Sequence, residues 1–233
     1  MNALDLIWLV PLLPFLGATA NGLLVGRLPR TGVDLIALGT PLASLALGLT
    51  AIVQYIGSLS PEPFSRTLYV WAASDITLDV GFQLDPLSCV MLFVVTFVGF
   101  LIHVYSVGYM AHEEGYQRYF AYLNLFMGAM LLLVLGNNFL VLFVGWEGVG
   151  LCSYLLIGFY FDQTFPPYAG RKAFIVNRIG DFAFLVGLFA LAERFGSLGF
   201  TEIFGAIEAD PSLVTGEYVL GMSFATFVGL CLF

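Results

Sequence analysis

The stretch that decides the fold is FLVLFVGWEGVGLCSYLLIGFYF, from Phe139 to Phe161. It is long enough to cross a bilayer as one helix, which takes about 20 apolar residues. Its one ionisable side chain of consequence is Glu147, about 12 Å along the helix from Phe139 and so near mid-depth. A charge near the bilayer centre costs roughly 2.5–3.5 kcal/mol on insertion scales. Since a chain that keeps such a group is expected to use it, the first hypothesis is movement of a proton or ion across a membrane.

The composition supports a membrane location. Of the 233 residues, 60% are hydrophobic and 10% are charged, and the mean hydropathy is +0.94. Soluble domains carry about 25% charged residues, so too little polar material is present here to cover a water-facing surface. The net charge is −8, and the 8 Lys and Arg residues form no cluster. This composition predicts an integral membrane protein that does not bind nucleic acid.

The three cysteines are interpreted as small buried hydrophobes. Cys89, Cys152 and Cys231 all lie in apolar runs, and none belongs to a C-x-x-C or Cys/His spacing. The sequence therefore predicts no haem, iron–sulfur or zinc site in this chain.

The fold class predicted from the apolar runs is all-α, a multi-pass transmembrane bundle with about seven spans. Pro41 interrupts the second run, and Gly136-Asn137-Asn138 forms a turn so short that the fourth and fifth spans must be antiparallel neighbours. The N-terminus carries Asp5 and no positive stretch, so we interpret the first run as a retained span rather than a removed signal peptide. The runs are Ala3–Leu24, Leu35–Ile56, Pro86–Met110, Tyr119–Leu135, Phe139–Phe161, Ala173–Ala192 and Tyr218–Phe233. The last run stops inside what should be a span, which predicts a fragment of a longer protein.

Two connections are long enough to hold structure of their own. In the first, residues 57–85, the segments Thr67–Val70 and Ile76–Phe82 alternate in polarity and predict a small hairpin outside the membrane. In the second, Gly196–Glu217, Thr201 before an acidic residue predicts the cap of a short helix.

The basic residues predict the orientation. If the N-terminus faces outward, the inner loops contain five of them and the outer loops contain only Arg66 and Arg194. The excess of Lys and Arg on cytoplasmic loops makes this the expected topology. The five predicted inner residues are Arg27, Arg30, Arg118, Arg171 and Lys172.

The charged residues within the spans are candidate sites. Gly145, Gly148 and Gly150 surround Glu147, so neighbouring helices can approach and the carboxyl should face protein rather than lipid. Arg178 and Asp181 are three residues apart on the sixth span, share one helix face and can pair. Each has a purely structural alternative. Glu147 would then be a hydrogen-bonding group between helices, and the pair would be a static salt bridge that holds helices together.

Two further residues are weaker candidates. Lys172, the only lysine, begins the sixth span roughly opposite Asp181, and either admits protons or only sets topology at the interface. His103 ends the third span near Tyr105 and Tyr109 and is a candidate relay, since histidine titrates near neutral pH. The alternative for this cluster is the ordinary aromatic belt of a span end.

Four stretches together resemble one family. They are LDPLSCVMLFVVTFVGFLIHVYSVGYM, RYFAYLNLFMGAMLLLVLGNNFLVLF, LFVGWEGVGLCSYLLIGFYF and RKAFIVNRIGDF. They are similar to the large antiporter-like subunit of respiratory complex I, called subunit L in bacteria and subunit 5 in mitochondria. The resemblance covers about Leu84 to Phe195, and on either side of it the fit is mainly one of hydropathy.

The resemblance implies a fold of over a dozen helices with two inverted five-helix repeats. Residues 1–118 would then be an N-terminal three-helix segment, and 119–233 the first, incomplete part of a proton-channel repeat. Proton transfer would involve Glu147, Lys172, Arg178 and Asp181, together with a lysine on a seventh helix that this sequence does not reach. The chain would hold no cofactor, with quinone, FMN and iron–sulfur clusters elsewhere in the complex, and its partners would be other membrane subunits.

The function implied is proton translocation within an NADH:quinone oxidoreductase, with the bacterial inner membrane first and a mitochondrial or thylakoid membrane as alternatives. A related alternative is the large subunit of a multisubunit sodium/proton antiporter, although the Gly-Val-Gly-Leu-Cys-Ser after Glu147 favours complex I. Photosynthetic complexes of the same type remain open. From other classes, about seven spans also fit a receptor, and static ion pairs fit a scaffold subunit.

Overall fold

Six long helices form the body of the protein. The computed structural model describes residues 2–58, 62–73 and 77–232. Each predicted span except the last lies in a helix that is long and apolar enough to cross a membrane. These helices are α1 (Leu9–Leu23, preceded by a 3₁₀ turn at Ala3–Leu6), α2 (Arg30–Gly57), α3 (Pro86–Tyr109), α4 (Tyr116–Leu135), α5 (Phe139–Ile157) and α6 (Phe165–Phe195). The predicted all-α, multi-pass membrane fold is confirmed.

Several helices begin before their apolar runs do. The helix α6 starts at Phe165, eight residues before the predicted span, and carries prolines at its first positions. Proline suits the first turn of a helix because the N–H that it lacks would have no partner there. Likewise α2 starts directly after Pro29 and takes in Asp34. Hydropathy marks only the part of a helix that suits lipid, whereas the backbone hydrogen bonds continue through its polar ends.

Prolines inside two helices do not break them. Pro41 lies within a continuous α2, so the predicted interruption there is wrong. Pro14 lies within α1, and because it has no N–H, the carbonyl of Val10 one turn earlier loses its helical partner. The buried hydroxyl of Ser44 on α2 donates to that carbonyl at 2.7 Å. Neighbouring helices can supply such bonds, which is why membrane helices tolerate proline.

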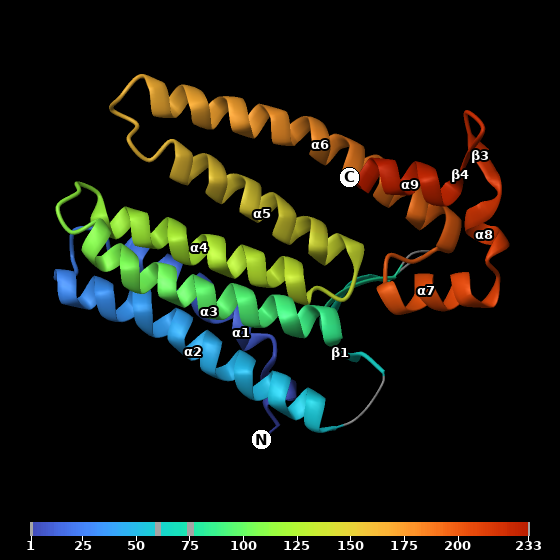
Figure 1. The fold of residues 1–233 in the computed structure, drawn as a ribbon, viewed down its shortest axis with the longest axis horizontal. Coiled ribbons are helices and arrows are strands. Elements are labelled where there is room, and N and C mark those ends of the chain that lie inside the picture. The colour runs from blue at the N-terminus through green and yellow to red at the C-terminus, as the bar shows by residue number, and fades with distance from the viewer. Residues whose placement is uncertain (1, 59–61, 74–76, 233) are drawn as a thin grey trace.

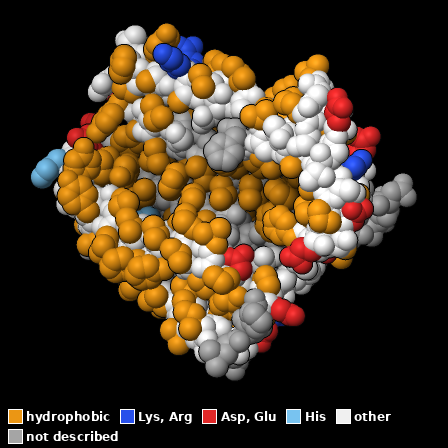
Figure 2. All heavy atoms as spheres, turned by 45° about the vertical axis from the view of Figure 1, so that its right-hand side comes forward, with side chains coloured by type: hydrophobic (Ala, Val, Ile, Leu, Met, Phe, Trp, Pro, Cys, Tyr) orange, Lys and Arg blue, Asp and Glu red, His pale blue; other side chains and the backbone are white. Residues whose placement is uncertain are grey.

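The helices α2 to α6 follow one another across the molecule, and α1 lies behind them (Figure 1). α1 packs against both α2 and α4, α3 lies on α2 and α4, and α5 and α6 extend the stack from α4. The largest hydrophobic core lies between the first four helices and includes Ile7, Leu92 and Leu131, each fully buried. The space-filling view shows a face covered mainly by hydrophobic side chains, with acidic groups along its right-hand edge and also below its centre (Figure 2). Such a surface suits a bilayer.

All three connections α1–α2, α3–α4 and α5–α6 lie at one end of the stack, at the left of Figure 1. The five basic residues that we predicted on inner loops therefore share this end. The hairpin, which contains Arg66, and α7, which follows Arg194, lie at the other end. The topology agrees with the charge pattern, while the side of the membrane that each end faces stays a prediction.

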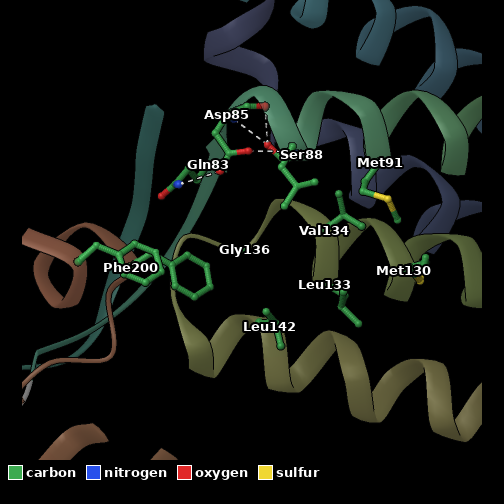
Figure 3. A pocket seen from close by; sticks show the side chains of 12 residues that line it. Gln83, Asp85, Ser88, Met91, Met130, Leu133, Val134, Gly136, Leu142 and Phe200 are labelled. Atoms are coloured by element: carbon green, nitrogen blue, oxygen red, sulfur yellow. Dashed lines mark hydrogen bonds between the residues drawn. The ribbon is translucent and has the colours of Figure 1, made fainter. Parts of the chain in front are cut away.

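The predicted hairpin is present. Strands β1 (Phe64–Ala73) and β2 (Thr77–Leu84) pair antiparallel, with Phe64 opposite Leu84 and Ala73 opposite Thr77. The first residue of the predicted second strand, Ile76, lies outside the described residues. From this hairpin the chain enters α3 through a capping box, in which Asp85 and Ser88 bond to each other's backbone N–H at 2.7 Å (Figure 3).

The seventh run begins as a second hairpin rather than as a span. Strands β3 (Glu217–Val219) and β4 (Met222–Ser223) turn through Leu220 and Gly221, both with positive φ, and α9 (Phe224–Leu232) follows. Positive φ at both central residues is the geometry of a tight two-residue hairpin. Phe233, the last residue of the predicted run, lies outside the described residues.

The acidic connection before this hairpin holds two short helices, α7 (Phe200–Ala209) and α8 (Ser212–Thr215). Thr201 is not a cap, since α7 already begins at Phe200 and Gly199 occupies the cap position without a side-chain bond. The prediction of a short helix is correct, and the predicted cap is wrong by two residues.

One polar junction ties the α4–α5 turn to the hairpin. Asn138 caps α5 by accepting from the N–H of Val141 at 2.8 Å, and its amide donates to the carbonyl of Asp79 in β2 at 2.8 Å. Asn137 donates to the Asp79 carboxylate at 2.8 Å. The short α4–α5 turn is therefore fastened to the hairpin, which fixes where α5 starts.

Candidate functional site

Glycines set the rotation of α5 and so the direction of Glu147. A Cβ on Gly145 would lie 2.5 Å from the backbone nitrogen of Leu133, and one on Gly148 would lie 2.9 Å from Ala129. The helix α5 is therefore pressed against α4 along its glycine face. Glu147 points instead toward α6, and its side chain is 25% exposed. The predicted protein-facing orientation is present, although the partner helix is not the one that the glycines contact.

Arg178 of α6 is shared between two carboxylates. Its Nη1 lies 2.5 Å from Oε1 of Glu147 and 3.8 Å from Oδ2 of Asp181. The predicted contact three residues along the helix is thus present but is the longer of the two. The guanidinium also lies over the ring of Phe174, 4.9 Å from its centroid. The sequence did not predict that Glu147 is the closer partner, because the packing of α5 on α6 decides it.

Asp181 is the most buried of the three charged groups, with a side chain 8% exposed. Its second oxygen, Oδ1, accepts from the indole Nε1 of Trp146 at 2.9 Å. The indole ring is stacked on Phe184, with centroids 6.0 Å apart. Sequence reasoning missed Trp146, and the only signal that could have found it was its position directly before Glu147.

The arrangement holds one cation between two acids. The shorter ion pair joins Arg178 to Glu147, and the longer one joins it to Asp181. Because an unpaired charge within a membrane is costly, the guanidinium can stabilise either carboxylate. A change of ion-pair partner therefore requires no large movement of the helices.

Lys172 and His103 lie apart from this cluster. Lys172 is exposed near the start of α6, about 9 Å along the helix axis from Arg178, and has no ion-pair partner among the described residues. His103 is buried on α3, where its Nδ1 lies 2.7 Å from the carbonyl oxygen of Gly99. Since α3 packs on α2 and α4, the helix α4 separates His103 from Glu147. Their roles stay predictions.

The pocket between α3 and α7 does not contact the charge cluster. The pocket in Figure 3, of 320 Å³, lies where α3, α4, α5 and α7 meet, and apolar side chains such as Leu133, Leu142 and Phe200 form most of its wall. In the part of the chain that the structure describes, no group of three His, Cys, Asp or Glu residues could hold a metal ion.

Two family matches cover more than half of the chain. Residues 71–120 match "NADH-Ubiquinone oxidoreductase (complex I), chain 5 N-terminus", and residues 136–233 match "NADH:quinone oxidoreductase/Mrp antiporter, TM". The second match contains Glu147, Trp146, Arg178 and Asp181.

Named relatives agree with these matches. NADH-quinone oxidoreductase subunit L of Pseudomonas aeruginosa is 45% identical over 206 residues, which is 87% of this chain and 33% of that protein. The chloroplastic NAD(P)H-quinone oxidoreductase subunit 5 of Zygnema circumcarinatum is 43% identical over 201 residues, or 83% of this chain and 28% of that one. The chain spans about a third of the length of these relatives.

A solved structure gives the same fold. A chain of the Mrp complex from Dietzia sp. superimposes with a TM-score of 0.73 and 25% identity, over 97% of this chain and 22% of that one. The protein belongs to the antiporter-like membrane subunits that NADH:quinone oxidoreductases and Mrp antiporters share. Within that class it resembles the N-terminal part of subunit L, or subunit 5, of complex I. This family membership leaves the receptor alternative without support.

Proposed function

We propose that this chain is part of the proton-translocating membrane subunit of an NADH:quinone oxidoreductase, and that Glu147 carries the proton. The observation that carries the proposal is the position of Arg178, which lies between Glu147 and Asp181 within one membrane-spanning pair of helices. The names of the relatives support the type of complex. Their similar identities leave the electron donor open between NADH and NAD(P)H.

The proposed step is a local change of ion-pair partner. While Arg178 pairs with Glu147, that carboxylate stays ionised. When the guanidinium moves to Asp181, Glu147 loses its countercharge and takes up a proton from water at the inner end. When Arg178 returns, Glu147 releases that proton to the next acceptor along the path. No bond other than those to the proton is made or broken, and the chain itself transfers no electrons.

The two other candidate residues have subsidiary proposed roles. Lys172 is exposed at the end where the proton would enter. Its amino group either passes protons toward the site or only fixes the topology. His103 is a candidate relay within α1–α4, and its separation from Glu147 by α4 makes it the weaker candidate.

We further propose that the N-terminus faces the outer side of a bacterial inner membrane and that the partners are other membrane subunits of the complex. The clustering of Arg27, Arg30, Arg118, Arg171 and Lys172 at one end supports this orientation. The half-exposed guanidinium of Arg178 supports a protein neighbour on that face, because a charge facing lipid at this depth is costly.

The test is Glu147→Gln in the intact complex with the full-length subunit. The amide keeps the shape of the side chain and still accepts from Arg178, but it cannot exchange a proton. We expect the number of protons pumped per quinone reduced to fall strongly in proteoliposomes, while the amount of assembled complex stays close to normal. Glu147→Asp is the matched control and should retain part of the pumping. Undiminished pumping with Glu147→Gln would mean that the charges are only a scaffold.

A second candidate is the large subunit of a sodium/proton antiporter, favoured by the structural similarity to the Mrp complex. The same proton site would then exchange protons for sodium. Sodium-dependent proton movement without quinone reduction would support this candidate over the first.

A further inference from the structure

Trp146 holds one of the two acids that share Arg178. Its indole N–H donates to Oδ1 of Asp181 at 2.9 Å, and its ring is stacked on Phe184. The stacking fixes the ring plane, so the N–H has a set direction. Although Trp146 is the chain neighbour of Glu147, its hydrogen bond goes to the competing carboxylate.

The distances indicate what this hydrogen bond does. Oδ2 of Asp181 is 3.8 Å from Nη1 of Arg178, beyond a normal hydrogen bond, whereas Oε1 of Glu147 is at 2.5 Å from the same nitrogen. We propose that Trp146 is a positioning residue of the charge site: by holding Asp181 through a neutral donor, it keeps that carboxylate from drawing Arg178 away from Glu147. This inference rests on the proposed function and adds a residue that sets the balance between the two ion pairs.

The physical basis is competition for one guanidinium. A carboxylate that accepts a hydrogen bond from an uncharged donor has part of its charge satisfied without a cation. If the indole N–H is removed, Arg178, at 3.8 Å, is the remaining polar partner of Asp181 that the described residues provide. Asp181 then turns toward Arg178, the Glu147 pair lengthens, and Glu147 binds its proton more tightly.

Among the described residues, no further charged group lies within ion-pair distance of Glu147, Arg178 and Asp181. The helix α4 presents Ala129 and Leu133 to this part of α5, and α9 places Cys231 beside Gly187 of α6. The ring of Tyr154 is packed against Phe174.

The test is Trp146→Phe in the intact complex, which removes the N–H and keeps a ring against Phe184. We expect the pH profile of proton pumping to move by about one unit toward alkaline pH, because a cation at ion-pair distance changes proton affinity by that order. Trp8→Phe, a substitution of the same kind in the α1–α4 core, should leave the profile unchanged. An unmoved profile with Trp146→Phe overturns the inference.

A second variant separates positioning from simple support of the fold. Asp181→Asn still accepts from the indole but no longer competes for Arg178, so its residual pumping should move toward acidic pH. In the Asp181→Asn background, Trp146→Phe should cause no further shift, since the two act through the same contact. Independent, additive shifts contradict the inference. If Trp146→Phe does not assemble, an unmoved profile with Asp181→Asn alone overturns it.

The outcomes distinguish this inference from the proposed function. If Glu147→Gln pumps normally, the proposed function fails. If Glu147→Gln abolishes pumping while Trp146→Phe leaves the pH profile in place, the proton site stands and only the role of Trp146 is lost.

Discussion

The first four helices and the pair α5–α6 bury polar side chains in opposite ways. Among the described residues of α1–α4, the buried polar side chains include no Lys, Arg, Asp or Glu, and Ser44 and Asn124 both donate to backbone carbonyls. Between α5 and α6, two carboxylates share one guanidinium. A hydroxyl or amide bonded to a backbone carbonyl has one satisfactory position, whereas a cation between two acids has two.

The difference between the two regions is tested most directly at the contact between α4 and α5. Gly145→Leu places a side chain where the α4 backbone lies, 2.5 Å from the nitrogen of Leu133. We expect a loss of at least about 3 kcal/mol in the free energy of unfolding, since backbone cannot move aside as a side chain can. Gly39→Leu is the control, because nothing lies within 4 Å of a Cβ there. Thermal unfolding in detergent measures both, and equal midpoints would mean that α5 is not pressed on α4.

The fastening of α5 to the hairpin gives a smaller effect. Asn138→Ala removes the cap on Val141 and the bond to the carbonyl of Asp79. We expect a loss of about 2 kcal/mol, roughly half of it from the cap. Asn138→Ser keeps a capping oxygen and should recover about half. If the two variants unfold at the same temperature, the cap contributes nothing to stability, and if Asn138→Ser unfolds with the unsubstituted protein, the bond to the hairpin contributes nothing.

A change within α1–α4 should affect stability and leave pumping alone. Ser44→Ala leaves the carbonyl of Val10 without a partner, because Pro14 offers it no N–H. We expect a loss of about 1.5 kcal/mol in the free energy of unfolding, with unchanged protons pumped per quinone in the assembled complex. Thr50→Ala removes an exposed hydroxyl bonded within its own helix and should be nearly neutral. Altered pumping by Ser44→Ala would contradict the assignment of proton transfer to α5–α6 alone.

The smallest effect is expected outside the membrane. Hydrogen bonds from the side chain and the backbone of Ser212 lower the pKa of Asp210 below its ordinary value. A lowered carboxyl pKa contributes stability that is present above the unfolded pKa and is lost as pH falls through the folded one. Ser212→Ala should raise the pKa of Asp210 toward its ordinary value. Site-resolved carboxyl NMR titration measures this, and an unchanged midpoint would contradict the hydrogen-bond assignment.

Most of the fold followed from hydropathy and turn residues. Six spans, the short turn at Gly136-Asn137-Asn138 and the outer hairpin were all predicted, because lipid demands long apolar helices and polar backbone must leave them. The structure of the seventh run was harder to predict. Leu220 and Gly221 form a tight turn there, although the composition of the run is apolar. The division at 118/119 stays a prediction, because α4 packs on α1 as well as on α5.

The candidate site was likewise predicted only in part from the sequence. The sequence placed Glu147, Arg178 and Asp181 within spans and gave the contact along one helix. It did not give the partner across helices or the part taken by Trp146, because both depend on how α5 is rotated against α4 and α6.

By itself, the sequence determined that this protein spans a membrane with helices and carries acids within them, since composition and spacing are local properties of the chain. Only the tertiary structure decided which acid holds Arg178 and which accepts from the indole. Ion pairs across helices depend on rotation and distance, and backbone contacts at Gly145 and Gly148 set these.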